Sequence, residues 1–151
     1  MSDQFIRPAT AGDVSRLAEI LVFNNRINFY PIFRCDEFSF GEMQVIPIAN
    51  QFLADPQLMA RTFVYDDGIV RGMMVLDGDE VKRLFVEPSF QGRGIGAALL
   101  RFAMERHHVT HLWALEKNTR AIRFYERHGF RLTDEKVFEE DTTEYLIHLK
   151  R

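Results

Sequence analysis

Three glycines within five positions, Gly92, Gly94 and Gly96, lie between a strand-like and a helix-like apolar run in FVEPSFQGRGIGAALL, residues 85–100. Glycine is unfavourable in regular structure, so such a cluster indicates a loop whose backbone approaches a ligand closely. A helix that begins inside the loop offers unpaired backbone N–H groups and the positive end of its dipole, and both favour an anion. The stretch therefore predicts a phosphate-binding turn, with Arg93 adding positive charge at its rim.

Two other phosphate-binding loops can be compared with this stretch. A P-loop needs a lysine and a hydroxyl residue after its last glycine, and neither follows here. The dinucleotide pattern G-x-G-x-x-A is satisfied from Gly92 to Ala97, and Glu116 follows about 20 residues later, where a ribose-binding acid is expected. However, five residues, Glu87 to Gln91, separate the strand from the first glycine, and too little chain follows for a doubly wound sheet. A dinucleotide-binding protein is therefore the weaker alternative.

A second group of candidate residues lies in NTRAIRFYERHGF, residues 118–130. Asn118 is a typical N-cap and Gly129 a typical residue just beyond a helix end, so the segment predicts a helix between them. Asn118, Ala121 and Tyr125 are spaced by three and four residues and therefore share one helix face. At 1.5 Å per residue, Asn118 and Tyr125 lie about 10 Å apart, which suits one long ligand that touches both.

Together, these two segments resemble the GCN5-related N-acetyltransferase (GNAT) family. Residues 91–97, QGRGIGA, resemble its Q/R-x-x-G-x-G/A signature, and residues 118–130 resemble N-x-x-A-x-x-F-Y-x-x-x-G-F at every defined position. The resemblance implies an N-acetyltransferase that moves an acetyl group from acetyl-CoA to a primary amine by direct attack in a ternary complex, with no metal. It implies that acetyl-CoA is bound by Leu84, Phe85, Val86, Gln91, Gly92, Arg93, Gly94, Ile95, Gly96, Ala97, Asn118 and Tyr125.

The resemblance also implies how these residues act. The strand before the glycine loop is expected to splay from its neighbour, so that pantetheine lies along the main chain of residues 84–86. A backbone N–H of Phe85 or Val86 is expected to stabilise the carbonyl oxygen as it gains charge. Tyr125 lies at the family's general-acid position and is expected to assist the departing thiolate. The resemblance thus implies chemical roles for the Tyr125 side chain and for backbone groups, with ordinary core packing as the alternative for Tyr125.

The base that deprotonates the amine is less well defined by the sequence. Glu80 falls where some family members carry a catalytic glutamate, at the start of the same strand, and is the first candidate. A turn acid in DGDE is the alternative explanation of this residue. Glu87 is the second candidate, and deprotonation through water is the third possibility.

The remaining elements follow from periodicity and turn chemistry. Thr10 and Asp13 fit a capping box before a first helix, and a second helix covers the forties to mid-fifties, with Pro47 at its start or at a kink. Residues 61–86 predict three strands joined by DDG and DGD turns, and THLWALE predicts another. FRLT and TEYLIHLK predict a final hairpin joined by DEKVFEED. We expect one α/β (α+β) domain over residues 1–151, in the order β-α-α-β-β-β-α-β-α-β-β, and from the resemblance a mixed, mostly antiparallel sheet flanked by helices.

Composition limits the partners and the compartment. Residues 82–127 carry nine basic and four acidic side chains, although the chain as a whole has a net charge of −3. The basic excess surrounds the glycines, as an anionic ligand requires, while the acidic total and the lack of a Lys/Arg stripe predict no nucleic-acid binding. No apolar run approaches the ~18 residues of a membrane span. Cys35 is the only cysteine, and with no signal-peptide pattern in the first ten residues it favours a cytoplasmic protein.

Several points stay open at this level. We expect the first helices and their connection, including the aromatic segment from Phe29 to Phe40, to wall the acceptor site, with ordinary core packing as the alternative.

His107 and His111 are four residues apart, but they straddle a helix end and a strand, so we expect surface imidazoles and no metal. The acceptor amine, the acyl-chain length and the oligomeric state, with a homodimer among the alternatives, are undetermined. A non-catalytic acyl-CoA-binding regulatory module is the alternative function.

Overall fold

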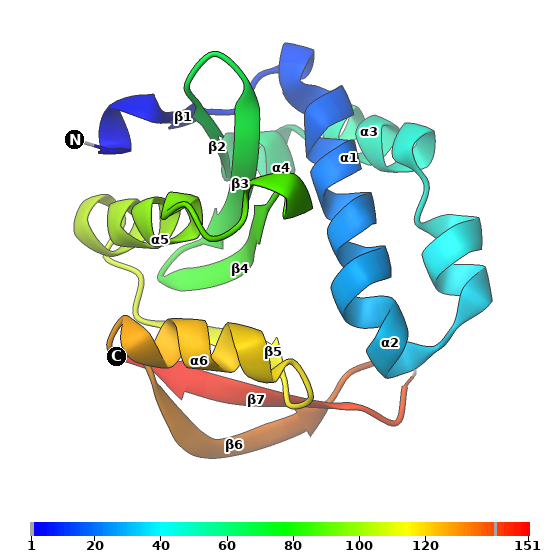
Figure 1. Ribbon diagram of the computed structural model, residues 1–151, viewed down its shortest axis with the longest axis vertical. Helices are drawn as coiled ribbons and strands as arrows, with labels where there is room; N and C mark the ends of the chain where they lie inside the picture. Colours follow the sequence, from blue (N-terminus) through cyan, green and yellow to red (C-terminus); the bar gives the residue numbers. More distant parts are fainter. Residues whose placement is uncertain (1, 141) are drawn as a thin grey trace.

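A seven-stranded sheet lies between two layers of helices in the computed structural model, which describes residues 2–140 and 142–151 (Figure 1). The strand order is β1-β2-β3-β4-β5-β7-β6. The strands are β1 (Ile6–Pro8), β2 (Thr62–Asp66), β3 (Val70–Asp77), β4 (Glu80–Val86), β5 (His111–Leu115), β6 (Arg131–Phe138) and β7 (Tyr145–Lys150). The helices are α1 (Val14–Asn24), α2 (Tyr30–Phe33), α3 (Val45–Ala54), α4 (Pro56–Ala60), α5 (Ile95–Arg106) and α6 (Thr119–Arg127).

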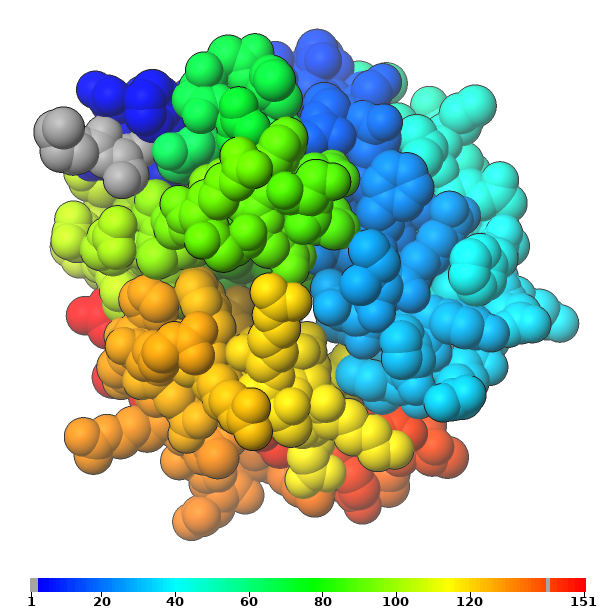
Figure 2. Space-filling model, viewed as in Figure 1, coloured from blue at the N-terminus to red at the C-terminus, as the bar shows by residue number. Residues whose placement is uncertain are grey.

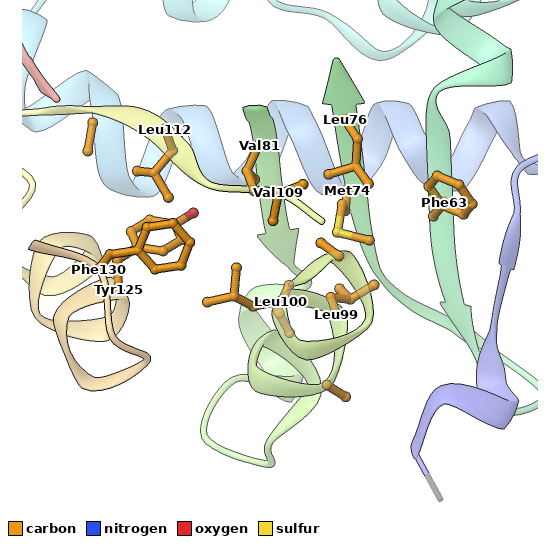
Figure 3. Close-up of a cluster of buried hydrophobic side chains, with 14 of the residues drawn as sticks. Phe63, Met74, Leu76, Val81, Leu99, Leu100, Val109, Leu112, Tyr125 and Phe130 are labelled. Carbon is orange, nitrogen blue, oxygen red and sulfur yellow. The ribbon is translucent and has the colours of Figure 1, made fainter. Parts of the chain in front are cut away.

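Each face of the sheet has its own hydrophobic core. On one face, α5 and α6 pack on side chains that include Met74, Leu112 and Leu149 (Figure 3). On the other face, α1 and α3 pack on β2 and β3, and no described residue of β5, β6 or β7 belongs to that cluster. The second helical layer therefore covers only part of its face of the sheet.

The sheet separates between β4 and β5. All other neighbouring strands are antiparallel, but β4 and β5 are parallel and pair only at Glu80 with His111 and Val81 with Leu112. Beyond these two pairs the strands diverge, and Figure 1 shows β1–β4 and β5–β7–β6 as two separate groups. This confirms the mixed, mostly antiparallel sheet, and it leaves the end of β4 without a strand along one edge.

Most predicted elements are present, but the short helix α2 within the aromatic segment was not predicted. The Asp55 carboxylate accepts a hydrogen bond from the Leu58 N–H and caps α4, a short helix that the sequence reading missed although Asp-Pro is a helix-start signal. The predicted loop DEKVFEED is wrong in extent, because β6 continues to Phe138. Phe138 stacks on Tyr145 across the hairpin, with ring centroids 4.2 Å apart, and this pair favours a longer strand.

The predicted helix boundaries are confirmed closely. Asn118 caps α6 by accepting a hydrogen bond from the Ala121 N–H, and Gly129 follows the helix with φ +94°. Pro47 lies in the first turn of α3, where a missing N–H costs nothing. Within residues 2–140 and 142–151, no helix combines the length and the apolar character that crossing a membrane requires.

Candidate active site

The gap between β4 and β5 opens into a cavity of about 490 Å³. Its walls come from the end of α1, the end of β4, the glycine loop with α5, and α6. The hollow is visible where the segments around residues 25, 90 and 120 meet in Figure 2. The cavity is lined by Asn24, Asn28, Phe29, Leu84, Phe85, Val86, Phe90, Gln91, Gly92, Gly94, Ile95, Gly96, Ala97, Asn118, Arg120, Ala121, Phe124, Tyr125, Arg127 and His128.

Of the twelve residues expected to hold acetyl-CoA, all except Arg93 line this cavity. The exposed guanidinium of Arg93 lies 5.4 Å from the centroid of Phe90, which does line it. Two further cations that line the cavity, Arg120 and Arg127, come from α6; both belong to the basic excess of residues 82–127 but were not assigned to the site. Their positions in NTRAIRFYERHGF could have been noticed, because both lie on the helix that carries Tyr125. The cavity therefore combines an apolar floor with a cationic rim.

The glycine loop points unpaired backbone donors at this cavity. Gly92 and Gly94 have φ values of +79° and +82°, a conformation that side-chain-bearing residues rarely adopt. The Ala98 N–H donates to the Gly94 carbonyl, which is the first bond of α5, so the N–H groups of residues 95–97 have no partner within the helix. Unpaired donors at a helix start suit a phosphate or pyrophosphate.

The free edge of β4 offers a second row of backbone groups. The Glu87 N–H donates to the Arg71 carbonyl, and Val86 is opposite Gly72. In an antiparallel pair, hydrogen-bonded and non-hydrogen-bonded positions alternate. Phe85 therefore points its N–H at β3, whereas Leu84 and Val86 point theirs away from β3 into the gap. This corrects the expectation that Phe85 could donate to the reacting carbonyl, and leaves the N–H groups of Leu84 and Val86.

Side chains from α1 and the glycine loop already occupy one acceptor on this edge. The Val86 carbonyl accepts from Asn24 Nδ2 at 3.0 Å and from Gln91 Nε2 at 3.2 Å. Asn24 is 2% exposed, and its Oδ1 accepts from Asn28 Nδ2. Since a carbonyl has two lone pairs, that of Val86 is fully used. Asn24 therefore fixes the end of α1 to the edge that lines the cavity, a role that the sequence alone did not indicate.

Tyr125 is the buried aromatic of the site. It is 8% exposed and packs against Phe124 and Phe130, with ring centroids 5.1 and 5.9 Å away. Its hydroxyl oxygen points from α6 toward Leu112 and the strands (Figure 3). Burial raises the pKa of the Tyr125 phenol well above its ordinary value, so the hydroxyl stays protonated at neutral pH. A neutral phenol in an apolar setting can donate a hydrogen bond or a proton.

The two carboxylates proposed as bases lie outside the cavity lining. Glu80 is at the closed end of β4, and its Oε1 is 3.7 Å from Lys82 Nζ. Because Val81 packs under α5, Glu80 faces the opposite side of the sheet, the side of α1. Glu87 is held by Arg16, with Oε2 and Nη1 3.1 Å apart. Neither Glu80 nor Glu87 is among the residues that line the cavity.

The aromatic segment divides into two parts. Phe29 lines the cavity and meets Phe85 edge to face, with centroids 6.0 Å apart. Tyr30 packs on Phe40, and both Phe38 and Phe40 are exposed. Within this segment, therefore, only Phe29 lies among the residues that line the described cavity. Asn24, the last residue of α1, and Asn28, in the helical turn Asn25–Phe29 that follows, form the wall beside it.

The fold distinguishes this loop from a dinucleotide site. A doubly wound sheet is parallel throughout, whereas β4 and β5 form the single parallel pair among the described strands. In residues 2–140 and 142–151, no three His, Cys, Asp or Glu side chains are arranged to hold a metal ion. His111 is not a solitary surface imidazole, however, because its Nδ1 lies 2.9 Å from His148 Nε2.

Comparison with known proteins gives matches to one family. Residues 59–132 match the acetyltransferase (GNAT) domain. Over 77 residues the chain is 35% identical to the peptidyl-lysine N-acetyltransferase YiaC of Escherichia coli (strain K12), a match that covers 50% of this chain. The match spans 53% of the length of that relative, so it compares about half of each protein.

Solved structures resemble the chain over almost its whole length. An N-acetyltransferase from Staphylococcus aureus Mu50 has a TM-score of 0.76 at 17% identity, covering 95% of this chain and 98% of the other. The PaiA N-acetyltransferase from Thermoplasma acidophilum, solved in complex with coenzyme A, has a TM-score of 0.69 at 18% identity, covering 97% and 98%. At such identities the likeness establishes the fold.

Proposed function

Because residues 59–132 of this chain belong to the GNAT family, we propose that the protein is an N-acetyltransferase. It uses acetyl-CoA as co-substrate and a primary amine as acceptor, and the amine attacks directly in a ternary complex. One observation carries the proposal: residues of the unpaired edge of β4, residues at the start of α5 and Tyr125 line a single cavity. These are the groups that a long, thin phosphate-bearing thioester needs.

Each of these groups has a distinct task. The N–H groups of residues 94–97 hold the pyrophosphate, with Arg93, Arg120 and Arg127 supplying positive charge around it. The edge of β4 binds the pantetheine arm as an added strand would bind. The N–H of Leu84 or Val86 donates to the thioester oxygen, which becomes negative as the amine attacks. Tyr125 donates to the sulfur as the carbon–sulfur bond breaks.

The amine must lose a proton before it attacks, because an ammonium group has no lone pair. Glu80 is the carboxylate that we assign to this step from the sequence, acting from the α1 side of the sheet. Its position at the closed end of β4 means that water connects it to the amine. The acceptor itself is a small-molecule amine or a protein amine, and the name of the E. coli relative supports including peptidyl lysine among the candidates.

Ligand binding tests the co-substrate. Acetyl-CoA at 100 times its Kd is expected to add about 2.7 kcal/mol to the free energy of unfolding and to raise the melting temperature by several degrees. NAD and NADP at the same concentration are expected to leave the melting temperature unchanged. The opposite result, stabilisation by NAD(P) alone, would favour the dinucleotide alternative.

Turnover tests the activity and separates it from the non-catalytic alternative. CoA release should be followed across lysine peptides, free amino acids, polyamines and aminoglycosides. We expect release with at least one amine, and a matching mass increase of one acetyl group on that amine. Tight acetyl-CoA binding without release for every amine would favour an acyl-CoA-binding regulatory module. A panel of longer acyl-CoA donors determines the acyl-chain preference.

A further inference from the structure

Arg83 is the residue of β4 directly before Leu84, whose N–H group points into the gap. It lies two residues beyond Val81, where the pairing of β4 with β5 ends. We propose that Arg83 binds a carboxylate of the acceptor, so that the acceptor is an amine that carries its own carboxylate, as an amino acid does. This inference rests on the proposed N-acetyltransferase function and narrows its acceptor.

The register places the Arg83 side chain on the α1 side of the sheet. Arg83 is opposite Val75, and Phe85 is opposite Met73. Directly opposite residues share one face of a sheet, and both Val75 and Met73 belong to the core under α1 and α3. Arg83 therefore faces the same side as Phe85, which lines the cavity and contacts Phe29. Arg83 itself is exposed and is the next side chain on this face, about 7 Å along the strand from that cavity wall.

Acetyl-CoA bound as proposed leaves this side of the sheet for the acceptor. The glycine loop and α6 hold the cofactor on the other side, where α5 and α6 pack on the sheet. The Leu84 N–H is one of the two donors proposed for the thioester oxygen, and one peptide bond joins it to the Arg83 carbonyl. An amine that attacks the thioester from the α1 side therefore has the Arg83 side chain beside it.

The charge of Arg83 is not matched within the protein. Of the three basic residues of β3 and β4, all of them in the described part of the chain, only Arg83 has no carboxylate at ion-pair distance. The nearby carboxylates already have other cationic partners, namely Asp77 with Arg61 at 3.9 Å, Glu80 with Lys82 at 3.7 Å and Glu87 with Arg16 at 3.1 Å. An anion from outside the chain can therefore bind Arg83 without displacing a partner.

The surroundings of Arg83 favour such an anion. Nearby protein removes part of the water from the guanidinium and lowers its pKa below the ordinary value, although the residue as a whole is exposed. The group stays charged at neutral pH, because the ordinary value is far above 7. A carboxylate accepts two parallel N–H bonds from the planar guanidinium, and its single negative charge matches the single positive charge of Arg83.

Glu80 and Arg83 present opposite charges on the same side of the sheet. They are three residues apart on β4, and no ion pair joins them in the structure that residues 2–140 and 142–151 form. An amino acid bound between them has its carboxylate at Arg83 and its ammonium group toward Glu80, which we assigned above to deprotonate it through water. A diamine or polyamine lacks the group that Arg83 binds.

The test uses pairs of amines that differ only in one carboxylate. The pairs are L-phenylalanine with 2-phenylethylamine, L-ornithine with putrescine and L-lysine with cadaverine. Values of kcat/KM are measured for wild type, Arg83→Gln, Arg83→Lys and Arg131→Gln. Arg131 is the matched control, because it is exposed on a strand, β6, has no carboxylate at ion-pair distance among the described residues and lies outside the cavity lining.

We expect wild type to prefer the carboxylate-bearing member of at least one pair by about 10- to 100-fold. Arg83→Gln should reduce that ratio to about 1 by raising KM for the amino acid, with little change for the carboxylate-free amine. Arg83→Lys keeps the charge but not the planar fork, so it should retain part of the ratio. Arg131→Gln should match wild type. Equal losses on both members of a pair in Arg83→Gln indicate a structural role and overturn the proposal. A wild type that acetylates an end-blocked lysine peptide better than every amino acid overturns it as well.

Binding without turnover separates this inference from the proposed function. Protein saturated with CoA, which has no acetyl group to transfer, is titrated calorimetrically with the carboxylate-bearing member of each pair. We expect binding that weakens about 10-fold or more in Arg83→Gln and is unchanged in Arg131→Gln. Absence of acetylation with every amine contradicts the proposed function, whereas carboxylate-dependent binding to the CoA complex still supports the site at Arg83. Acetylation with no preference for a carboxylate overturns this inference alone.

Discussion

The two sides of the gap between β4 and β5 are built from different kinds of groups. On the side of α5 and α6, the groups that face the ligand are mostly backbone N–H groups, presented by the glycine loop and by the edge of β4. On the side of α1 they are side chains, namely Asn24 at the end of α1 and Asn28 in the turn that follows it. Backbone groups recognise what all acyl-CoA thioesters share, whereas side chains suit what differs between acceptors.

Of the predictions, Tyr125→Phe is expected to have the largest effect on the catalytic rate. Tyr125 belongs to the α5–α6 side of the gap. The substitution removes a hydroxyl and keeps the ring that packs on Phe124 and Phe130, so the fold and the cavity persist. We expect kcat to fall about 100-fold, because the thiolate then leaves without a proton donor, while the Kd for acetyl-CoA changes less than threefold. Steady-state rates and isothermal titration measure the two quantities. An unchanged kcat would remove Tyr125 from the chemistry.

This comparison also explains how much the sequence could predict. A backbone site is determined locally, so all but one of the residues predicted from the glycine loop, its strand and NTRAIRFYERHGF line the cavity. Arg93 was the exception, because the direction of a long exposed side chain is not determined by its motif. The helices and strands followed from caps, turns and periodicity, apart from α2, α4 and the length of β6.

Side-chain clusters from distant elements could not be predicted in the same way. His111 and His148 are 37 residues apart, and only the order β4-β5-β7-β6 brings them into contact. The contact of Asn24 with the Val86 carbonyl likewise depends on where α1 ends relative to the gap. For Phe85, knowledge of the strand alone was insufficient. Which N–H groups face the gap depends on the register of β4 with β3. The sequence of one strand does not determine that register.

Gly94→Val tests the backbone N–H donors at the start of α5, because it changes the backbone conformation there and removes no polar group. A β-branched residue at φ +82° costs about 1–2 kcal/mol, and relief of that strain rotates the donors at the start of α5. We expect acetyl-CoA to bind about 10- to 30-fold more weakly. Gly68→Val is the matched control, because Gly68 also has a positive φ but lies in the β2–β3 turn, outside the cavity lining. The control should lose thermal stability and keep its affinity. Equal affinity loss in both variants would contradict a local phosphate site.

Asn24→Leu tests the connection between the two sides. The leucine side chain has nearly the same shape, but it removes the donor to the Val86 and Ile20 carbonyls in a buried place. We expect the free energy of unfolding to fall by about 1.5 kcal/mol in urea titrations, with an unchanged m-value. Asn28→Ala removes only the bond to Asn24 Oδ1 and should cost less than 1 kcal/mol. A larger loss in Asn28→Ala would mean that Asn24 is not the residue that fixes α1 to β4.

The free energy of unfolding at alkaline pH gives the smallest expected effect. It tests whether the Tyr125 phenol is shielded from water and from positive charge, as its burial implies. Burial raises the folded-state pKa of Tyr125, so above pH 10 the unfolded chain loses this proton while the folded chain retains it. The unfolded state then binds fewer protons, and stability falls as pH rises, by up to about 1.4 kcal/mol per pH unit from this residue. Tyr125→Phe should remove that share of the loss between pH 10 and 11, measured as a smaller fall in the free energy of unfolding than in wild type. Identical alkaline slopes would show that water or a cationic group in the cavity stabilises the phenolate, and the acid role of Tyr125 would then need a different electrostatic basis.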